Sequence, residues 1–442
     1  MKPLQLQELQ ELQKKASADK HQLALRRALY KNQLPDLVQK PERLQTMKQR
    51  FSLDLKTLPV NHQKQSGRCW LFAGLNVLRE IGCKTFGVSN IEFSQNYVAF
   101  YDKLEKINYF LQTMNQFLDC DYDDRAFQYF LKTGIQDGGQ WDMFVSLIEK
   151  YGIVVKDAME ETASSSNTRA MNQLINTVLR NYAAKARSLY PNHEKIEQLQ
   201  EQTLEQLYQF LTTNFGFPPQ QFDFEYIDKD QKYHIESNIT PLEMLQKVLT
   251  EPLSDYVSII HAPTADKPYY QTYTVKNLGN VINGQPVQYL NLPLAEFKAL
   301  ILAQLKDREA VWFGADVGYF GDRSSGIWDD QAFDYQELFG LDLAISKADS
   351  LRYAHSQMNH AMVFGGVNLI NDTPTKWKIE NSWGEDAGLK GYFVASDSWF
   401  DRFVYQAVVH KKYLSNEQLQ AWQSVPIVLK PWDPMGSLAV TE

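Results

Sequence analysis

A thiol stands at the start of a strongly apolar segment. Cys69 closes the stretch QSGRC, and the apolar run WLFAGLNVLREIG begins directly after it. A run with so few polar positions predicts a buried helix whose N-terminus lies at Cys69. The partial positive charge at a helix N-terminus lowers the pKa of a nearby thiol. The pattern therefore favours a nucleophilic thiolate at this position.

A thiolate nucleophile needs an imidazole as base and proton donor, and that imidazole needs an acceptor to orient it. Of the eight histidines, only His360 stands at the start of an apolar, strand-like run, NHAMVFGGV. A polar residue in an aromatic setting, Asn381 in IENSWGE, follows downstream. We therefore predict that Cys69, His360 and Asn381 act together. We interpret most of the other histidines, including His355, as structural.

The elements that must position these residues divide unevenly along the chain. The first half is mainly helical in pattern, with an amphipathic arm up to about residue 55 that packs on a core or on a neighbouring subunit. Residues 170–215 predict helix with a break at Pro191, and 163–168, ASSSNT, predict a polar loop. Short β-rich pieces follow from Tyr256 onward. Helices first and strands second predict an α+β fold.

Composition limits the classes of function. The 442 residues, 44% of them hydrophobic, exceed what one hydrophobic core usually serves, so we expect insertions or appended subdomains. A net charge of −8 with interspersed signs disfavours nucleic acid and anionic membranes as partners. We find neither a membrane-spanning run nor a signal-peptide pattern. Three cysteines are too few for a disulfide framework, which favours the reducing cytoplasm.

Four separated motifs resemble those of papain-like cysteine peptidases, and most closely the bleomycin hydrolase and aminopeptidase C family. Gln63 precedes Cys69 by six positions and Trp70 follows it. The other three motifs are His360-Ala361, Asn381-Ser382-Trp383-Gly384, and Gly138-Gly139 with Trp141 close behind. The segments QSGRCW, DGGQWDM, SSSNTR, ENSWGED and PWDPMG are typical of this family, so the likeness runs from about residue 50 to residue 439.

The resemblance implies a role for each site residue. Cys69 attacks the scissile carbonyl, His360 protonates the leaving amine, and Asn381 orients the imidazole. The Gln63 side chain and the Cys69 N–H form the oxyanion hole. The remaining implied residues bind substrate or shield the site, and they are Gly138, Gly139, Ala361 and Trp383.

The resemblance also implies the architecture. We expect a two-lobe papain-like fold with helical insertions and an N-terminal arm, assembled as a homohexamer around an internal chamber. The expected divisions are an arm over 1–58, a helical lobe over 59–250, a β-rich lobe over 251–424, and a tail over 425–442 that enters the cleft.

The implied function is hydrolysis of oligopeptides in the cytoplasm, most simply as an aminopeptidase of broad specificity. An endopeptidase on the same scaffold stays open, because the chain continues as Val440-Thr441-Glu442 beyond Ala439, where the family pattern ends. A third alternative is a nucleic-acid-associated binding protein, which the charge disfavours.

Other features fit plainer interpretations. Ser66 stands where secreted relatives carry a disulfide cysteine, in keeping with a reducing compartment, and Ala387 replaces a family tryptophan. We interpret Cys83 and Cys120 as small buried residues, and Trp141 as a core aromatic. Paired Cys or His spacing is missing, and FGADVGYFGD lacks the Lys-Ser/Thr of a phosphate loop, so we expect no metal and no cofactor.

Overall fold

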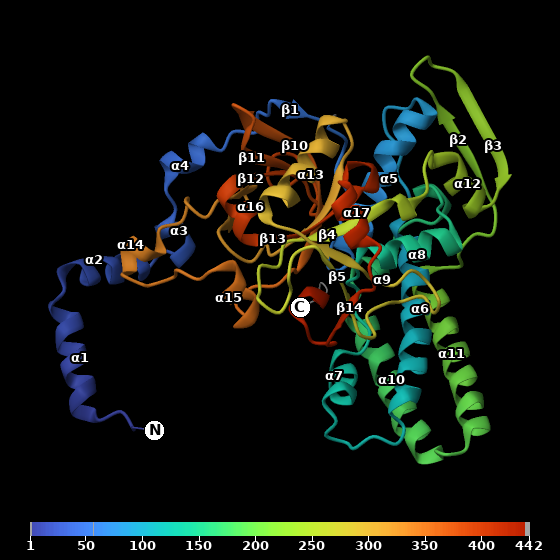
Figure 1. Cartoon of the computed structure of the whole chain (residues 1–442), viewed down its shortest axis with the longest axis horizontal. Coiled ribbons are helices and arrows are strands. Elements are labelled where there is room, and N and C mark those ends of the chain that lie inside the picture. Colours follow the sequence, from blue (N-terminus) through green and yellow to red (C-terminus); the bar gives the residue numbers. More distant parts are fainter. Residues whose placement is uncertain (1, 56, 438–442) are drawn as a thin grey trace.

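The structure is a computed structural model that describes residues 2–55 and 57–437. Its secondary structure is mixed, as the α+β expectation requires (Figure 1). The helices of the first part of the chain are α1 Leu6–Ala18, α2 Lys20–Leu29, α3 Leu34–Val38, α4 Pro41–Thr46, α5 Cys69–Phe86, α6 Gln95–Met114, α7 Arg125–Thr133, α8 Trp141–Tyr151, α9 Ala163–Ser166, α10 Arg169–Leu189, α11 His193–Phe215 and α12 Pro241–Val248. The later helices are α13 Leu294–Lys306, α14 Tyr335–Phe339, α15 Lys347–Arg352, α16 Asp397–Phe403 and α17 Asn416–Trp422.

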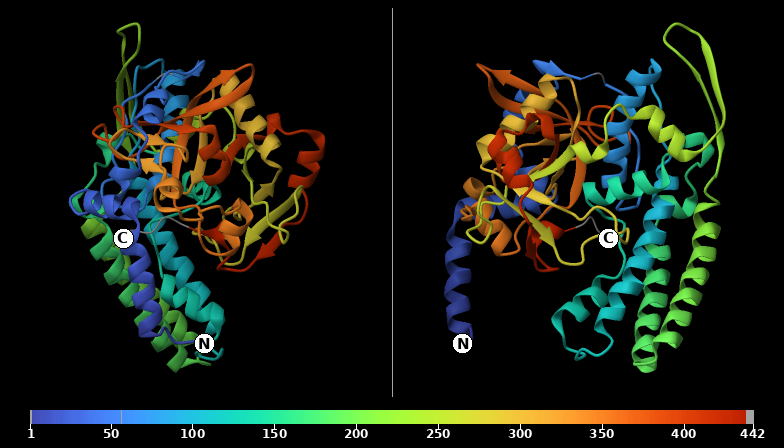
Figure 2. Two further views of the ribbon diagram at one scale, coloured as in Figure 1. Left: turned by 90° about the vertical axis from the view of Figure 1, so that its left-hand side faces the viewer. Right: turned by 45° about the vertical axis from the view of Figure 1, so that its right-hand side comes forward.

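One large mixed sheet carries most of the strands. Its strand order is β14-β5-β6-β4-β13-β7-β10-β11-β12-β9-β8, and β1 pairs with β10 beside this path. A separate hairpin of β2 and β3 projects from the body (Figure 2). The strands are β1 Leu53–Asp54, β2 Phe222–Ile227, β3 Tyr233–Ile239, β4 Tyr256–Ile260, β5 Gln271–Val275, β6 Tyr289–Asn291, β7 Val311–Ala315, β8 Gly321–Asp322, β9 Ile327–Trp328, β10 His360–Ile370, β11 Thr373–Glu380, β12 Tyr392–Ser396, β13 Val404–His410 and β14 Ile427–Leu429.

Two element boundaries that matter for the site agree with the sequence. Helix α5 begins at Cys69, and nearly all of its first three turns are buried, as an apolar run without a polar face requires. Strand β10 begins at His360 and lies between β7 and β11 in the middle of the sheet. Because α5 packs against β10, the first residues of the two elements are brought to the same side of the structure.

Helices α6, α10 and α11 extend together from the body on the side away from α1 (Figure 1). The predicted break at Pro191 is confirmed, because α10 ends at Leu189 and α11 begins at His193. The predicted loop at 163–168 is wrong. Residues 163–166 form the short helix α9, which a capping box between Thr162 and Ser165 stabilises. The β2–β3 hairpin was not predicted, although its exposed and buried positions partly alternate.

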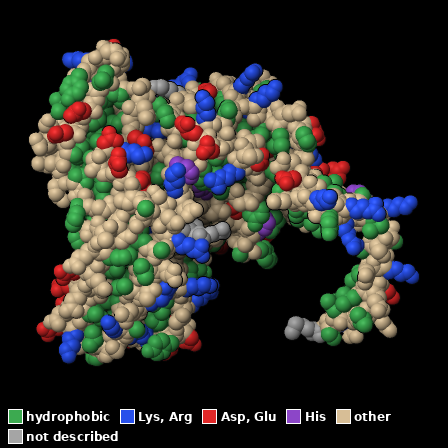
Figure 3. Space-filling view, turned by 180° about the vertical axis from the view of Figure 1, so that it is seen from behind, with side chains coloured by type: hydrophobic (Ala, Val, Ile, Leu, Met, Phe, Trp, Pro, Cys, Tyr) green, Lys and Arg blue, Asp and Glu red, His purple; other side chains and the backbone are tan. Residues whose placement is uncertain are grey.

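The N-terminal arm does not pack on the core of its own chain along its first helix. Helix α1 buries none of its side chains, and Leu4, Leu6, Leu9 and Leu12 are exposed. Figure 3 shows this segment standing away from the body of the molecule, whose surface carries acidic and basic side chains of interspersed sign. Of the two expectations for the arm, packing on the core of its own chain is therefore wrong for α1.

Candidate functional site

The N-terminus of α5 holds the predicted nucleophile. Cys69 is 1% exposed, and its sulfur accepts a hydrogen bond from the backbone N–H of Ala361, with 3.4 Å between sulfur and nitrogen. Ala361 follows His360 at the start of β10, so the thiol lies beside the chain that carries the imidazole. The structure thus brings together two residues that the sequence placed far apart.

His360 and Asn381 form the second contact of the site. The imidazole Nε2 lies 2.8 Å from Asn381 Oδ1, and Oδ1 also accepts from the Ser382 N–H at 2.8 Å. A backbone N–H can only donate, so the amide presents its oxygen to both groups and Nε2 carries the proton. This tautomer leaves Nδ1 of His360 as the nitrogen that can accept a proton. The Asn381 amide nitrogen is buried without a hydrogen-bond partner among the described residues.

Trp383 packs against this pair. Its ring centroid lies 4.9 Å from that of His360, at an interplanar angle of 31°. The guanidinium of Arg323 lies over the Trp383 ring, 4.8 Å from its centroid. The indole therefore shields one side of the imidazole from water. In the same turn Gly384 has φ +80°, and a Cβ on it would lie 2.5 Å from His62.

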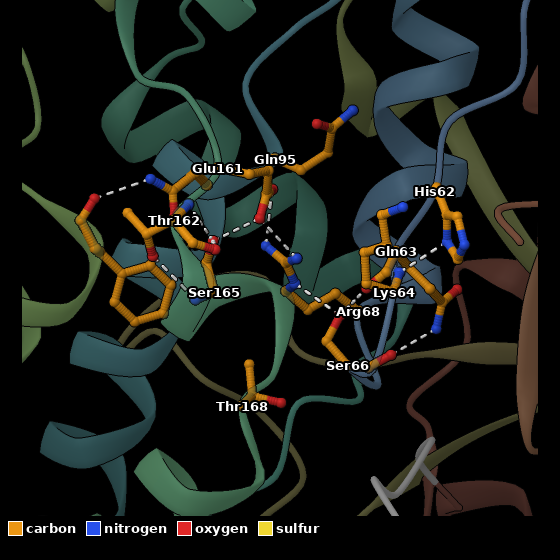
Figure 4. A network of polar contacts seen from close by, with 12 residues as sticks. His62, Gln63, Lys64, Ser66, Arg68, Gln95, Glu161, Thr162, Ser165 and Thr168 are labelled. Atoms are coloured by element: carbon orange, nitrogen blue, oxygen red, sulfur yellow. Dashed lines mark hydrogen bonds and ion pairs between the residues drawn. The ribbon is translucent and has the colours of Figure 1, made fainter. Parts of the chain in front are cut away.

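Gln63 is held in a fixed orientation (Figure 4). Its side-chain nitrogen donates to the Ser66 carbonyl at 2.6 Å, and its side-chain oxygen accepts from the Ser382 hydroxyl. Its backbone N–H donates to the Ser382 carbonyl at 2.8 Å. One N–H of the amide is used at Ser66, which leaves the other available. Gln63 is thus tied to the turn that carries Asn381.

Arg68 fixes the loop between Gln63 and Cys69. Its guanidinium makes a paired contact with the two carboxylate oxygens of Glu161, at 3.0 and 2.9 Å, and donates to the Ser66 hydroxyl at 3.0 Å (Figure 4). Arg68 is 1% exposed, so the pair is largely shielded from solvent. Neither Arg68 nor Glu161 was predicted as a site residue, and the only signal in the sequence was the place of Arg68 within QSGRCW.

The segment of Gly138 and Gly139 lies against the first turn of α5. A Cβ on Gly139 would lie 2.5 Å from the Trp70 indole, so close packing on Trp70 requires glycine at this position. The Gly138 carbonyl accepts from Lys106 at 2.7 Å, and the Trp70 indole N–H donates to the carbonyl of Asp137 at 2.7 Å. Trp141 is buried in the core, as predicted.

The protonation of the thiol differs from expectation. Burial raises the pKa of Cys69 to about 11, although hydrogen bonds from backbone N–H groups, including those of Ala361 and Trp70, act in the opposite direction. Burial also lowers the pKa of His360 to about 4, against the effect of the Asn381 hydrogen bond. The expectation of a thiol pKa lowered by the helix N-terminus is therefore wrong for this closed arrangement, because desolvation outweighs the helix end.

The last described residue of the tail lies between the two sides of the site. The Gln140 side chain donates to the Ser437 carbonyl at 3.1 Å, and the Ser437 hydroxyl donates to the carbonyl of Met358, two residues before His360. Two contacts hold the segment just before Ser437. The Lys267 ammonium pairs with the Asp433 carboxylate at 2.9 Å, and the Arg125 guanidinium lies over the Trp432 ring, 3.9 Å from its centroid. Ala439 and Val440-Thr441-Glu442 lie outside the described residues.

The other cysteines lie apart from these contacts. Cys83 and Cys120 are half-buried, and each packs against the core, so full burial was not correct for either. None of the three cysteines forms a disulfide. Over residues 2–55 and 57–437, we find no group of three or more His, Cys, Asp or Glu side chains that could hold a metal ion. Over the same residues, helices long and apolar enough to cross a membrane are also absent.

An α+β fold in which a thiol at a helix N-terminus packs against the first residues of a central strand is the papain-like fold of cysteine-type peptidases. The chain belongs to the Peptidase C1-like family, which it matches over residues 3–436. It is accordingly an enzyme, a cysteine-type peptidase. The resemblance drawn from the sequence motifs is thereby confirmed.

Similar proteins support the same assignment over nearly the full length. An aminopeptidase C of Listeria innocua is 45% identical over 433 residues, covering 98% of each chain. An aminopeptidase C of Lactobacillus delbrueckii subsp. lactis is 47% identical over 395 residues, covering 88% of each chain. The crystal structure of PepW from Lactobacillus rhamnosis HN001 has a TM-score of 0.97, at 45% identity and 99% coverage of both chains.

Proposed function

We propose that the protein is a cysteine aminopeptidase that removes residues from the free N-terminus of oligopeptides. One observation carries the mechanism: the Cys69 sulfur lies at a helix N-terminus against Ala361, while the neighbouring His360 is oriented by Asn381. The aminopeptidase activity is supported by relatives named aminopeptidase C that align over nearly the whole chain.

The proposed nucleophile is the Cys69 thiolate, which forms when the thiol passes its proton to the neighbouring imidazole of His360. His360 Nδ1 takes this proton, the sulfur bonds to the scissile carbonyl carbon, and the carbonyl electrons move to oxygen. The Cys69 N–H and the second N–H of the Gln63 amide stabilise this oxyanion, and removal of one such donor typically costs about 3 kcal/mol. The tetrahedral intermediate then collapses and breaks the C–N bond, while the imidazolium gives its proton to the leaving amine.

A water then attacks the thioester, with His360 accepting its proton. The C–S bond breaks, the thiol is regenerated and the acid product leaves. Asn381 keeps the imidazole in one orientation throughout, and Trp383 shields that hydrogen bond. Gly138 and Gly139 present backbone to the substrate, and Ala361 lies beside the sulfur.

We propose that the tail makes the enzyme an aminopeptidase. Its described part reaches Gln140, which follows the two glycines, and Met358, which precedes the imidazole strand. A segment in that place leaves room on one side of the scissile bond for little more than the N-terminal residue of a peptide. An endopeptidase would instead accept an extended chain on both sides.

Paired substrates test this proposal. We expect turnover of aminoacyl reporters with a free amine, and at least about a tenfold lower kcat/KM for the same sequences with a blocked N-terminus. Efficient cleavage of blocked peptides alone would assign endopeptidase activity. Cys69→Ala should abolish both activities, and turnover that persists in this variant would contradict the mechanism. Binding of single-stranded DNA at low ionic strength would favour the nucleic-acid alternative, which the −8 charge disfavours.

We further propose that the enzyme acts in the cytoplasm as a homo-oligomer, a hexamer by resemblance. The exposed leucine side chains of α1 form an apolar stripe on the projecting arm, which a neighbouring subunit would cover. Cysteines without disulfides fit a reducing compartment. Light scattering of the full chain, with and without residues 1–18, tests the assembly, and cell fractionation tests the compartment.

A further inference from the structure

The carboxylate of Asp137, the residue before Gly138 and Gly139, has no exposed surface. Four donors surround it. One oxygen accepts from the Gly67 N–H at 2.8 Å and from the Thr168 hydroxyl, and the other accepts from Asn172 at 2.8 Å and from the Lys103 ammonium. This buried carboxylate is therefore fully used by hydrogen bonds from three separate parts of the chain.

Asp137 contacts the chain on both sides of the nucleophile. Its carboxylate holds the N–H of Gly67, two positions before Cys69, and its backbone carbonyl accepts from the indole of Trp70, one position after Cys69. Cys69 is thus bracketed by two hydrogen bonds to a single residue. Because Asp137 also precedes Gly138, the same residue joins the nucleophile loop to the segment proposed to hold substrate.

We propose that Asp137 is a positioning residue of the oxyanion hole, because it holds Gly67 and Trp70 on the two sides of Cys69 so that the Cys69 N–H faces the developing oxyanion. This inference rests on the proposed function, because it concerns the step in which Cys69 attacks a carbonyl.

The charge state of Asp137 supports this role. Burial alone would raise the pKa of its carboxyl, but Lys103 and the other donors hold the pKa well below its usual range. Both oxygens of an ionised carboxylate accept hydrogen bonds. An asparagine in its place would present an NH2 to donors on one side, so at least one contact would be lost.

The network contains a natural control. Asp102 is 2% exposed and pairs with Lys106 at 2.7 Å, and its other oxygen accepts from Asn280 at 3.1 Å. It matches Asp137 in burial and in having a lysine partner. The hydrogen bonds of its carboxylate reach neither Gly67 nor Trp70. Lys106, its partner, lies over the Trp70 ring and donates to the Gly138 carbonyl, so this pair borders the same loop. Asp102→Asn therefore shows the cost of disturbing a buried ion pair that does not hold the Gly67 N–H.

The test compares two reactions of the same sulfur. A peptide aldehyde adds to Cys69 with formation of a C–S bond, and the thiol proton ends on the former carbonyl oxygen, which occupies the oxyanion hole. Iodoacetamide alkylates the sulfur by displacing iodide and forms no such oxygen. A displaced oxyanion hole weakens only the first reaction, whereas general disruption of the site changes both.

For Asp137→Asn we expect about a hundredfold weaker aldehyde binding and a matching loss of kcat/KM, of the size found when an oxyanion donor is removed. The alkylation rate should stay within about threefold of the wild-type rate. Asp102→Asn should show a smaller loss of aldehyde affinity and of kcat/KM than Asp137→Asn. Aldehyde affinity that stays within threefold in a folded Asp137→Asn protein overturns the inference, and so does an equal loss in both reactions.

A second pair of variants keeps the test decisive if Asp137→Asn does not fold. Lys103→Gln combined with Asp137→Asn replaces the ion pair with two amides and keeps an acceptor for Gly67. Lys103→Gln combined with Asp137→Ala removes that acceptor. We expect the first combination to bind the aldehyde at least about tenfold more tightly than the second. Equal affinity refutes the positioning role, whereas turnover that survives Cys69→Ala refutes the proposed function itself.

Discussion

The sulfur of Cys69 lies 3.4 Å from the backbone nitrogen of Ala361, although 292 positions separate the two residues along the chain. The contact exists because α5 packs on β10, so that the first residue of the helix meets the second residue of the strand. His360, the first residue of that strand, is thereby carried to the nucleophile by backbone geometry. The expected consequences of this arrangement can be measured one residue at a time.

Cys69→Ala should lower peptide turnover by at least about a thousandfold, because the nucleophile is removed while the small side chain still fits the buried position. Steady-state hydrolysis of an aminoacyl reporter measures the effect. Cys83→Ala, a half-buried thiol on the same helix α5, is the matched control and should keep wild-type kcat. A similar loss in both variants would argue against a specific role for Cys69.

Trp383→Ala should lower kcat by about tenfold or more, because water then reaches the hydrogen bond between His360 and Asn381 and weakens it. Trp383→Phe keeps a ring over the imidazole and should retain most of the activity. The two variants are compared by kcat at saturating substrate. If the alanine and phenylalanine variants are equally active, shielding by Trp383 does not contribute.

Gly139→Ala should destabilise the protein by about 1–3 kcal/mol and reduce turnover, because the added Cβ would lie 2.5 Å from the Trp70 indole. Urea unfolding measures the change in stability. Gly365→Ala is the control, since a Cβ there meets no atom within 4 Å. A stable, active Gly139→Ala protein would mean that the segment can move away from Trp70 at little cost.

Arg68→Lys should lower the free energy of unfolding by about 1–3 kcal/mol, because an ammonium cannot reproduce the paired contact with Glu161 and the bond to Ser66. We also expect lower kcat, since Arg68 directly precedes Cys69. The exposed Arg50→Lys serves as control and should change neither quantity. Unchanged unfolding of Arg68→Lys would show that the loop needs only a positive charge.

The buried imidazole of His360 predicts a pH dependence of stability. Burial lowers its pKa to about 4 from an ordinary value of 6.5, so the unfolded chain binds a proton at higher pH than the folded protein. The stabilising contribution is complete above pH 6.5 and is lost as the pH falls towards 4, by on the order of 3 kcal/mol.

Urea unfolding of the wild type and of His360→Asn between pH 7.5 and 4 isolates this contribution, because the other titrating groups are shared. We expect the wild type to lose more unfolding free energy than His360→Asn as the pH falls. A difference that does not change with pH would contradict the burial of a neutral imidazole.

Much of the site could be predicted from local sequence. The apolar run after Cys69 and the strand-like run from His360 each reported where an element begins, because a buried helix or strand must be apolar along its length. The turn Asn381-Ser382-Trp383-Gly384 was identifiable as a motif. The capping box of α9 was also local, but the serine-rich composition of 163–168 resembled a loop more strongly.

Only the tertiary structure determines the environment of side chains that are surrounded by distant segments of the chain. The sequence pointed to a helix N-terminus at Cys69, yet the pKa of the thiol follows burial contributed by the packed lobes. Asp137 and Arg68 have no local sequence pattern that distinguishes them as buried residues. In the folded chain both are buried, and each forms hydrogen bonds with residues far away in the sequence. Side-chain periodicity indicates which residues are buried, but it does not indicate which distant residues form their hydrogen bonds and ion pairs. Those partners determine the chemistry of the site.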